Sequence, residues 1–400
     1  GSRHDREGDQ AMTDNFWMRA VACVGIAVVL IGDGLALANH SSSARDSSES
    51  GAAPPAALAP VLPALEAFVE QSRGLKYKQP VPIDLLSTTA FTAKLRESDS
   101  SGGNSGGGDQ AAFEGFLRAL GLVHGPINLN AAASAVEEVG IVGFYDPKAK
   151  RLFVRGVDPT PFVRQVLVHE LTHALDDQYF NLDRPNLDER NDESSESFRA
   201  LVEGSAVTVE QKYVASLSEA DQKQAADEES SGSGSASDAI PDVVARLLSY
   251  PYVVGPRFVD ALVQAGGEAR LEQALLNPPV TSEQTLHPEK FLAGEGPIAV
   301  AKPAPEGKVV DRGVLGEVVL LLMLEEVLPT AVARKAAAGW GGDQYVAWRS
   351  GAGKTCVKWA TVMDTPTDTA ELVSALHTWQ EKNPSATVQV GDAIVVTNCG

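Results

Sequence analysis

The chain has 400 residues, of which 44% are hydrophobic, enough to fill the core of one large or two modest domains. Its 53 Asp and Glu residues against 33 Lys and Arg residues give a formal net charge of -20. Such an acidic chain repels phosphate backbones and anionic lipid headgroups, which argues against nucleic-acid binding.

The first 38 residues have the composition of an export signal. Arginines precede an apolar run over residues 20–32, and Ala36-Leu37-Ala38 is a small-x-small cleavage pattern. The run is short for a membrane span of roughly 20 residues. Residues 1–38 are therefore predicted to be a signal peptide or a retained signal anchor, so we expect a protein outside the cytoplasm, either secreted or membrane-anchored at the cell envelope.

Three stretches lack apolar clusters. Residues 39–63 are rich in Ser, Ala and Pro and predict a disordered stalk, whereas residues 97–109 and 216–238 are rich in Ser, Gly and acidic residues and predict flexible surface loops. The folded body is then expected to consist of a core over residues 64–338 and a C-terminal unit over residues 339–400.

Within the core, the sequence predicts mainly helices and one hairpin. Apolar residues recur at helical spacing over 111–122, and residues 139–155 read as two short strands around a turn at Pro147. Thr160 followed by Pro161 predicts the start of a buried helix that ends near Tyr179. Further helices are expected over residues 194–213, 240–249, 256–266 and 314–328.

The C-terminal unit is predicted to be a small α/β unit, with strands over residues 345–348, 355–359, 387–389 and 393–396 around a helix over 367–380. The whole chain is therefore expected to be α+β. Cys356 and Cys399 remain once Cys23 of the export signal is set aside, and in an oxidising compartment they predict a disulfide. Two buried free thiols are the alternative.

The sequence His169-Glu170-Leu171-Thr172-His173 lies in the middle of the predicted buried helix. Positions i and i+4 of a helix lie one above the other, so both imidazoles can face one cation, with Glu170 beside them. Neutral imidazole nitrogens suit Zn²⁺, and a neighbouring carboxylate can take a proton from a zinc-bound water. The alternative is a hydrogen-bonded histidine pair without a metal.

A catalytic zinc site usually has three protein ligands. Glu203 is the preferred third ligand, because it is surrounded by small and apolar residues in a predicted helix. Glu196 and Glu210 share its helix face and compete with it, but their polar neighbours indicate a solvated surface. A salt-bridged helix face is the alternative for all three.

Asp176 and Asp177 follow the histidines closely. They are near enough to orient the ligating imidazoles, but capping or solvating the end of the helix is the preferred interpretation.

These motifs resemble a known family. HELTHALDDQYF (169–180) and ALVEGSA (200–206) resemble the gluzincins, and more narrowly a family of exported bacterial and archaeal neutral zinc metallopeptidase-like proteins. SYPYVVGPRF (249–258), PPVTSEQTLHPEKFLAGE (278–295) and GWGGDQY (339–345) extend the resemblance over most of the chain from about residue 139. The resemblance implies a zincin-like metallopeptidase core that hydrolyses peptide bonds in peptide or protein substrates.

By this resemblance His169, His173 and Glu203 bind one catalytic Zn²⁺, and Glu170 is the general base. A His or Tyr on a later segment stabilises the oxyanion in gluzincins, and His287 or Tyr252 fits this role. The sequence departs from the family in having no acid three or four residues after Glu203, which leaves the orientation of the histidines unexplained.

Three further features of the sequence bear on function. The predicted strand over residues 151–155 is expected either to pair with an extended substrate or to be an ordinary internal strand. Residues 351–355 look like a phosphate-binding loop, but Trp348 stands where that motif needs glycine, so no nucleotide is expected. The rival function is a catalytically silent, zinc-ordered binding or scaffold protein of the cell envelope, although the free carboxylate of Glu170 argues against it.

Overall fold

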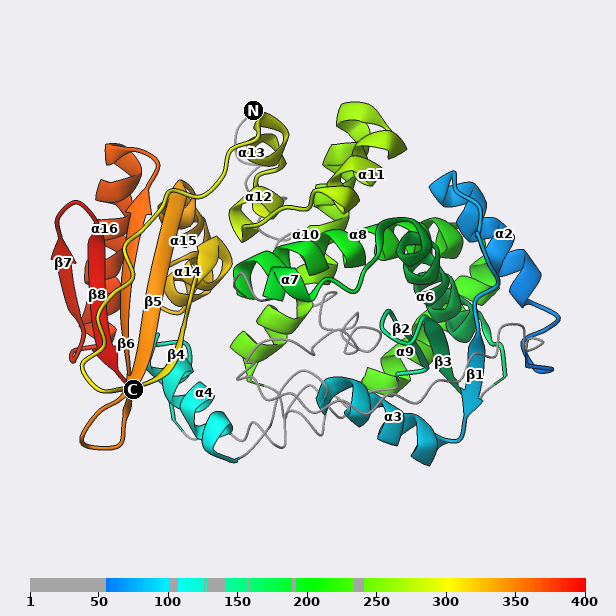
Figure 1. Cartoon of the computed structure of the whole chain (residues 1–400), viewed down its shortest axis with the longest axis horizontal. Helices are drawn as coiled ribbons and strands as arrows, with labels where there is room; N and C mark the ends of the chain where they lie inside the picture. The colour runs from blue at the N-terminus through cyan, green and yellow to red at the C-terminus, as the bar shows by residue number, and fades with distance from the viewer. Residues whose placement is uncertain are drawn as a thin grey trace. The chain divides into compact units, whose positions relative to one another are not determined.

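The computed structural model describes residues 55–100, 107–125, 127, 141–156, 158–188, 192–233 and 241–400 (Figure 1). The protein is α+β and mainly helical, as predicted, and it divides into two compact units. Among the described residues, those within 1–104, 130–185 and 199–278 form the first unit, and those within 105–129, 186–198 and 279–400 form the second. The second unit therefore extends beyond residues 339–400 and also takes in earlier segments of the chain.

The predicted export signal over residues 1–38 and most of the predicted stalk lie outside the described residues. The end of the stalk prediction is wrong, since Leu58 and Leu62 are buried in the core of the first unit. No helix in the described part of the chain is both long and apolar enough to cross a membrane.

The first unit is built from helices around a small three-stranded sheet. Its strands are β1 (Ile83–Leu86), β2 (Gly143–Asp146) and β3 (Arg151–Arg155). Its helices are α2 (Leu62–Arg73), α3 (Thr88–Ser100), α6 (Pro161–Phe180), α9 (Glu219–Ser233), α10 (Asp242–Gly266), α11 (Glu268–Leu276) and most of α8 (Asp192–Ser216). The short helix α7 (Pro185–Asp188) lies at the division between the units.

The sheet has the order β1-β3-β2. The predicted hairpin is confirmed, because β2 and β3 pair in antiparallel fashion, and β1 adds a parallel strand on the other side of β3. Since β3 is paired along both edges, its backbone has no free edge for another strand. Of the two interpretations of residues 151–155, the ordinary internal strand is therefore confirmed and pairing with a substrate is wrong.

Helix α6 runs through the core of the first unit. Thr160 caps its start, where the side-chain oxygen accepts a hydrogen bond from the backbone N–H of Val163, and Pro161 occupies the first turn, as predicted. The helix is buried on nearly all sides, so it includes buried charged residues as well as apolar ones. Its apolar side packs against α2, the sheet and α8 in the largest described core cluster.

Two loop predictions fail where helices continue. Residues 216–238 were expected to form a loop, but α8 extends to Ser216 and α9 covers Glu219–Ser233. Residues 97–109 were also expected to form a loop, but they include the end of α3 and the start of α4 (Gly107–Ala119). Residues 101–106 and 234–238 lie outside the described residues.

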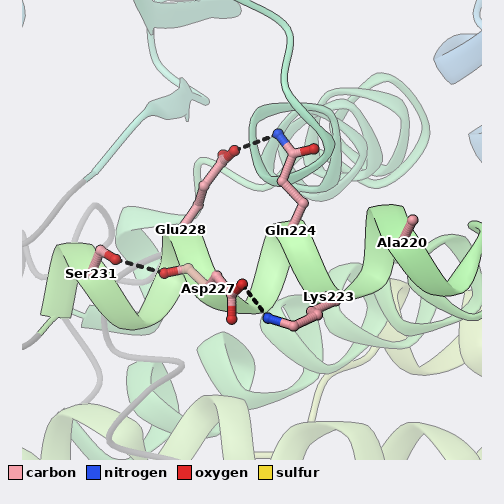
Figure 2. Close-up of a pocket in the computed structure, with 6 residues that line it drawn as sticks. All are labelled: Ala220, Lys223, Gln224, Asp227, Glu228 and Ser231. Atoms are coloured by element: carbon pink, nitrogen blue, oxygen red, sulfur yellow. Dashed lines mark hydrogen bonds and ion pairs between the residues drawn. The ribbon is translucent and has the colours of Figure 1, made fainter.

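Local pairing and contacts with α6 explain why the acidic segment α9 is helical. Figure 2 shows that Lys223 pairs with Asp227 and Gln224 with Glu228, each four residues apart. Pairs at this spacing stabilise a helix by about 0.2–0.5 kcal/mol each. On its inner face, the buried Ala225 packs against apolar side chains of α6.

The predicted helices over 240–249 and 256–266 form one helix, α10, which contains Pro251 and Pro256. A proline inside a helix removes a backbone hydrogen bond and normally kinks or ends it. Here α10 continues because most residues around both prolines are buried against neighbouring elements, so tertiary packing outweighs the local penalty.

The second unit contains an antiparallel sheet of order β4-β5-β6-β8-β7, with β4 (Lys308–Gly313), β5 (Trp340–Arg349), β6 (Thr355–Met363), β7 (Thr387–Val390) and β8 (Ile394–Cys399). Its remaining helices are α12 (Ser282–Leu286), α13 (Pro288–Ala293), α14 (Gly316–Glu325), α15 (Thr330–Ala337) and α16 (Pro366–Lys382). Helices α14, α15 and α16 lie along one face of the sheet (Figure 1). Strand β4 was not predicted.

The predicted disulfide between Cys356 and Cys399 is confirmed. The two residues lie directly opposite each other on β6 and β8. Residues 350–354 form the turn between β5 and β6, and a strand follows the turn where a phosphate-binding loop would lead into a helix.

Candidate metal centre

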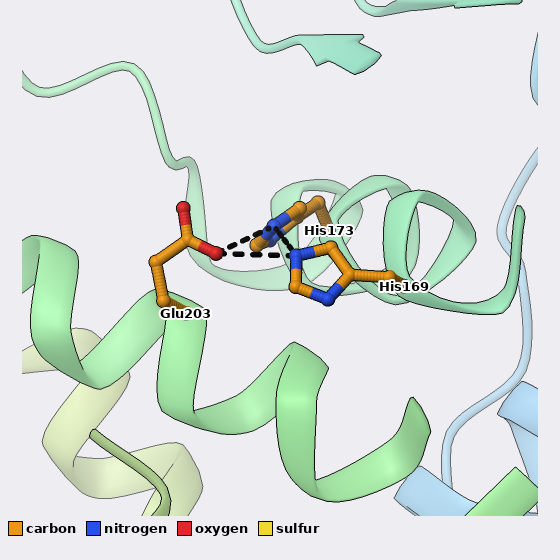
Figure 3. A group of neighbouring side chains, drawn as sticks. All are labelled: His169, His173 and Glu203. Carbon is orange, nitrogen blue, oxygen red and sulfur yellow. Dashed lines mark hydrogen bonds and ion pairs between the residues drawn. The ribbon is translucent and has the colours of Figure 1, made fainter. Parts of the chain in front are cut away.

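Helices α6 and α8 bring together the three residues predicted to bind a metal. His169 Nε2 lies 3.0 Å from His173 Nε2 and 3.1 Å from Glu203 Oε2, and His173 Nε2 lies 3.4 Å from the same oxygen. Figure 3 shows the two imidazoles projecting from α6 toward the carboxylate on α8. The predicted set of His169, His173 and Glu203 is thus a single buried group.

The geometry of this group fits a zinc ion. Donors at about 2.0–2.1 Å from a tetrahedral zinc ion lie about 3.3 Å from one another, and the three measured separations are close to this value. The three residues are 2%, 5% and 2% exposed. His173 Nδ1 is also buried and has no hydrogen-bond partner among the described residues. Holding these polar groups together away from water is costly unless a cation is shared among them.

The charges in the group are strongly coupled. Burial alone would lower the pKa of His169, but its hydrogen bonds with Glu203 and Glu210 raise it well above the ordinary value. Burial opposes ionisation of Glu203, but the two neighbouring imidazoles lower the pKa of its carboxyl below the usual range. Glu203 is therefore ionised and ready to bind a cation.

Glu170 lies on the same helix and is held by the sheet. Its Oε2 accepts a 2.8 Å hydrogen bond from the backbone N–H of Tyr145 on strand β2. Glu170 is 4% exposed, and burial raises the pKa of its carboxyl above the ordinary value, although the neighbouring imidazoles lower it in part. A carboxyl with a raised pKa can both accept and return a proton near neutral pH.

Glu210 is the carboxylate that contacts the far ring nitrogen of His169, although it lies seven residues after Glu203 and not three or four. Its Oε2 lies 2.9 Å from His169 Nδ1, and its Oε1 accepts a 2.7 Å hydrogen bond from Gln165 Nε2. This contact favours the tautomer in which His169 Nδ1 carries a proton and Nε2 is free to bind a metal.

The prediction that Glu210 is solvated is therefore wrong, since it is 8% exposed. Its position seven residues after Glu203, on the same helix face, was the available signal. Glu196, the other competing residue, is half-buried and does not belong to the three-residue group.

Asp176 and Asp177 do not contact the histidines. Asp176 is buried, where it forms an ion pair with Arg73 at 2.8 Å and accepts a hydrogen bond from the Ser205 hydroxyl. The expectation that Asp176 caps or solvates the helix end is wrong. Asp177 lies near the helix end, where its Oδ1 accepts a hydrogen bond from the backbone N–H of Leu182, just beyond α6.

Asp177 is also buried among other polar groups. It accepts a hydrogen bond from the Tyr145 hydroxyl at 2.6 Å and pairs with Lys150 at 2.8 Å. Tyr145 therefore contacts α6 twice, through its backbone at Glu170 and through its side chain at Asp177.

The two residues suggested for oxyanion stabilisation lie in different units. Tyr252, on α10 of the first unit, is buried and donates a hydrogen bond to Glu203. His287 belongs to the second unit, where its Nε2 lies 2.9 Å from Glu317.

A second acidic group occurs in the second unit. Glu283, Glu295 and Asp364 lie close together, and the ammonium of Lys290 pairs with all three. The lysine already supplies the positive charge that these carboxylates share, so this group is a salt-bridge cluster.

The chain was compared with family models, curated proteins and solved structures. Residues 305–398 match the family model described as a domain of unknown function, DUF8575. The matched residues lie within the second unit and cover its sheet except Cys399, the last residue of β8. No curated protein and no solved structure matches the chain.

Proposed function

We propose that this protein is a zinc-dependent peptidase of the gluzincin type, with a zincin-like core that hydrolyses peptide bonds in peptide or protein substrates. The observation that carries the proposal is the buried group of His169 Nε2, His173 Nε2 and Glu203 Oε2, with separations of 3.0–3.4 Å. Glu170 is not one of these three residues and lies on the same helix next to His169, where its carboxyl is available to act as a base.

Each residue of the site has a distinct role in this proposal. His169, His173 and Glu203 would hold one zinc ion, and a zinc ion bound there would polarise a carbonyl and lower the pKa of water. Glu170 would accept a proton from the attacking water on a carboxylate oxygen and deliver it to the leaving amine nitrogen. The hydrogen bond from the Tyr145 N–H would keep the Glu170 carboxylate in place between these transfers.

We also propose that the protein works outside the cytoplasm, secreted or anchored at the cell envelope. The Cys356–Cys399 disulfide supports this location, because cytoplasmic proteins generally keep their thiols reduced. The signal-like composition of residues 1–38 points in the same direction.

The test compares the natural chain with Glu170→Gln for metal content and for cleavage of a peptide library. We expect both to contain about one zinc ion per chain and only the natural chain to cleave peptides. Equal cleavage by both would refute the assignment of Glu170 as the base. Zinc binding without cleavage by the natural chain would favour a zinc-ordered binding or scaffold protein, and absence of zinc from both would refute the metal centre.

A further inference from the structure

Buried polar groups continue behind Glu203, on the side of α8 that faces α10. The phenol of Tyr252 donates a hydrogen bond to the Glu203 carboxylate, which can only accept, and accepts one from the Arg199 guanidinium, which can only donate. Tyr252 and Arg199 are 7% and 8% exposed. Arg199 lies one helical turn before Glu203, so both side chains leave the same face of α8.

The position of Tyr252 relative to Glu203 is set by a close contact between two helices. Gly204 on α8 lies directly against the backbone of Gly255 on α10, and a Cβ atom on either glycine would overlap the opposite helix. The Tyr252 ring also packs against Val207 of α8. Because the two backbones touch beside Glu203, the tyrosine is held by helix packing and not by a flexible loop.

A tyrosine hydroxyl has a single proton to donate. In this structure that proton is directed to the Glu203 carboxylate, so the phenol is not free to donate to a developing oxyanion at the same time. Glu203 in turn directs its Oε2 toward both His169 and His173. The tyrosine therefore acts on the metal centre through the carboxylate ligand.

We infer that Tyr252 is a positioning residue of the metal centre, which orients the Glu203 carboxylate toward the two histidines, and that Arg199 in turn orients Tyr252. This inference rests on the zinc centre proposed above. It replaces the oxyanion-stabilising role that the family resemblance implies for Tyr252. Glu210 contacts His169 at Nδ1, the ring nitrogen that faces away from the His173 and Glu203 donors, so two of the three residues of the group have a further buried polar partner.

The first test uses the full chain with Tyr252→Phe, which removes only the hydroxyl, and the matched control Tyr250→Phe on the same helix. Zinc affinity is measured by competition with a chromophoric chelator, and the absorption bands of the cobalt(II)-loaded protein report the ligand geometry. We expect Y252F to weaken zinc binding at least about tenfold, as is typical for loss of a ligand's outer partner, and to shift the cobalt bands. Y250F should change neither.

Zinc affinity and cobalt bands of Y252F that match those of the natural chain would overturn the inference while leaving the zinc centre intact. Failure of the natural chain to bind zinc would instead refute the proposed function itself. The two outcomes are therefore distinguishable.

A second measurement avoids any dependence on the folding of Y252F. A single 3-fluorotyrosine is placed at position 252 of the otherwise natural chain, or at position 250 as the control, and its fluorine resonance is followed during addition of zinc. We expect the resonance at position 252 to move at one equivalent of zinc, and the resonance at position 250 to stay. An unchanged resonance at position 252 on saturation with zinc would also overturn the inference.

Discussion

The contact between Glu210 and His169 allows a quantitative test of the metal centre. Glu210→Ala would leave two buried donors, His169 Nδ1 and Gln165 Nε2, without their carboxylate acceptor. A hydrogen bond to a charged group contributes about 1.5–3 kcal/mol, and loss of the outer partner of a metal ligand typically weakens metal binding about 10–100-fold. At about 1.4 kcal/mol per factor of ten, these two estimates agree.

We therefore expect Glu210→Ala to weaken zinc binding by about 10–100-fold, measured by competition with a chelator at constant pH. Glu210→Gln keeps an acceptor oxygen but loses the charge, so its effect should be smaller. Glu196→Ala, a change at a half-buried glutamate on the same helix, is the matched control and should leave zinc affinity unchanged. If Glu210→Ala folded normally and bound zinc within twofold of the natural chain, the orienting role of Glu210 would be refuted.

Three further predictions concern stability. Burial raises the pKa of Glu193 to about 8, so the folded state favours the protonated carboxyl. The contribution of Glu193 to the free energy of unfolding is therefore fully present below about pH 4.5 and is lost as the pH rises toward 8. Glu193→Gln should flatten this fall in the free energy of unfolding, and an unchanged slope in urea melts between pH 5 and 9 would contradict the assignment. Arg73→Leu should lower the free energy of unfolding, measured with denaturant, by about 3–5 kcal/mol, because Asp176 would keep a buried, unpaired charge. Adding Asp176→Asn should recover part of this loss. An equal or larger loss in the double variant would refute this explanation. The Cys356–Cys399 disulfide closes a loop of 43 residues, so its reduction should lower the stability of the second unit by about 4 kcal/mol. An unchanged melting temperature after complete reduction would contradict this prediction.

The elements that could be predicted from the sequence are those set by neighbouring residues. Thr160 and Pro161 mark the start of α6 because capping depends on a hydroxyl and a fixed backbone angle at adjacent positions. His169 and His173 face the same way because the pitch of a helix places residues four apart on one side. The hairpin of β2 and β3 likewise follows from a short turn between two apolar runs.

Contacts between distant segments decided the rest. The carboxylate of Glu203 reaches the histidines, and Glu210 reaches His169, because α8 packs on α6. The polar neighbours of Glu210 in the sequence pointed to a solvated side chain, and only the packing of the two helices shows that it is buried. Helix α10 continues through two prolines because its burial outweighs their local penalty. Strand β1 joins the sheet from a segment more than 60 residues before β3. Local hydrogen bonds and helical pitch depend only on neighbouring residues, whereas burial and charge pairing depend on which segments the tertiary fold brings together.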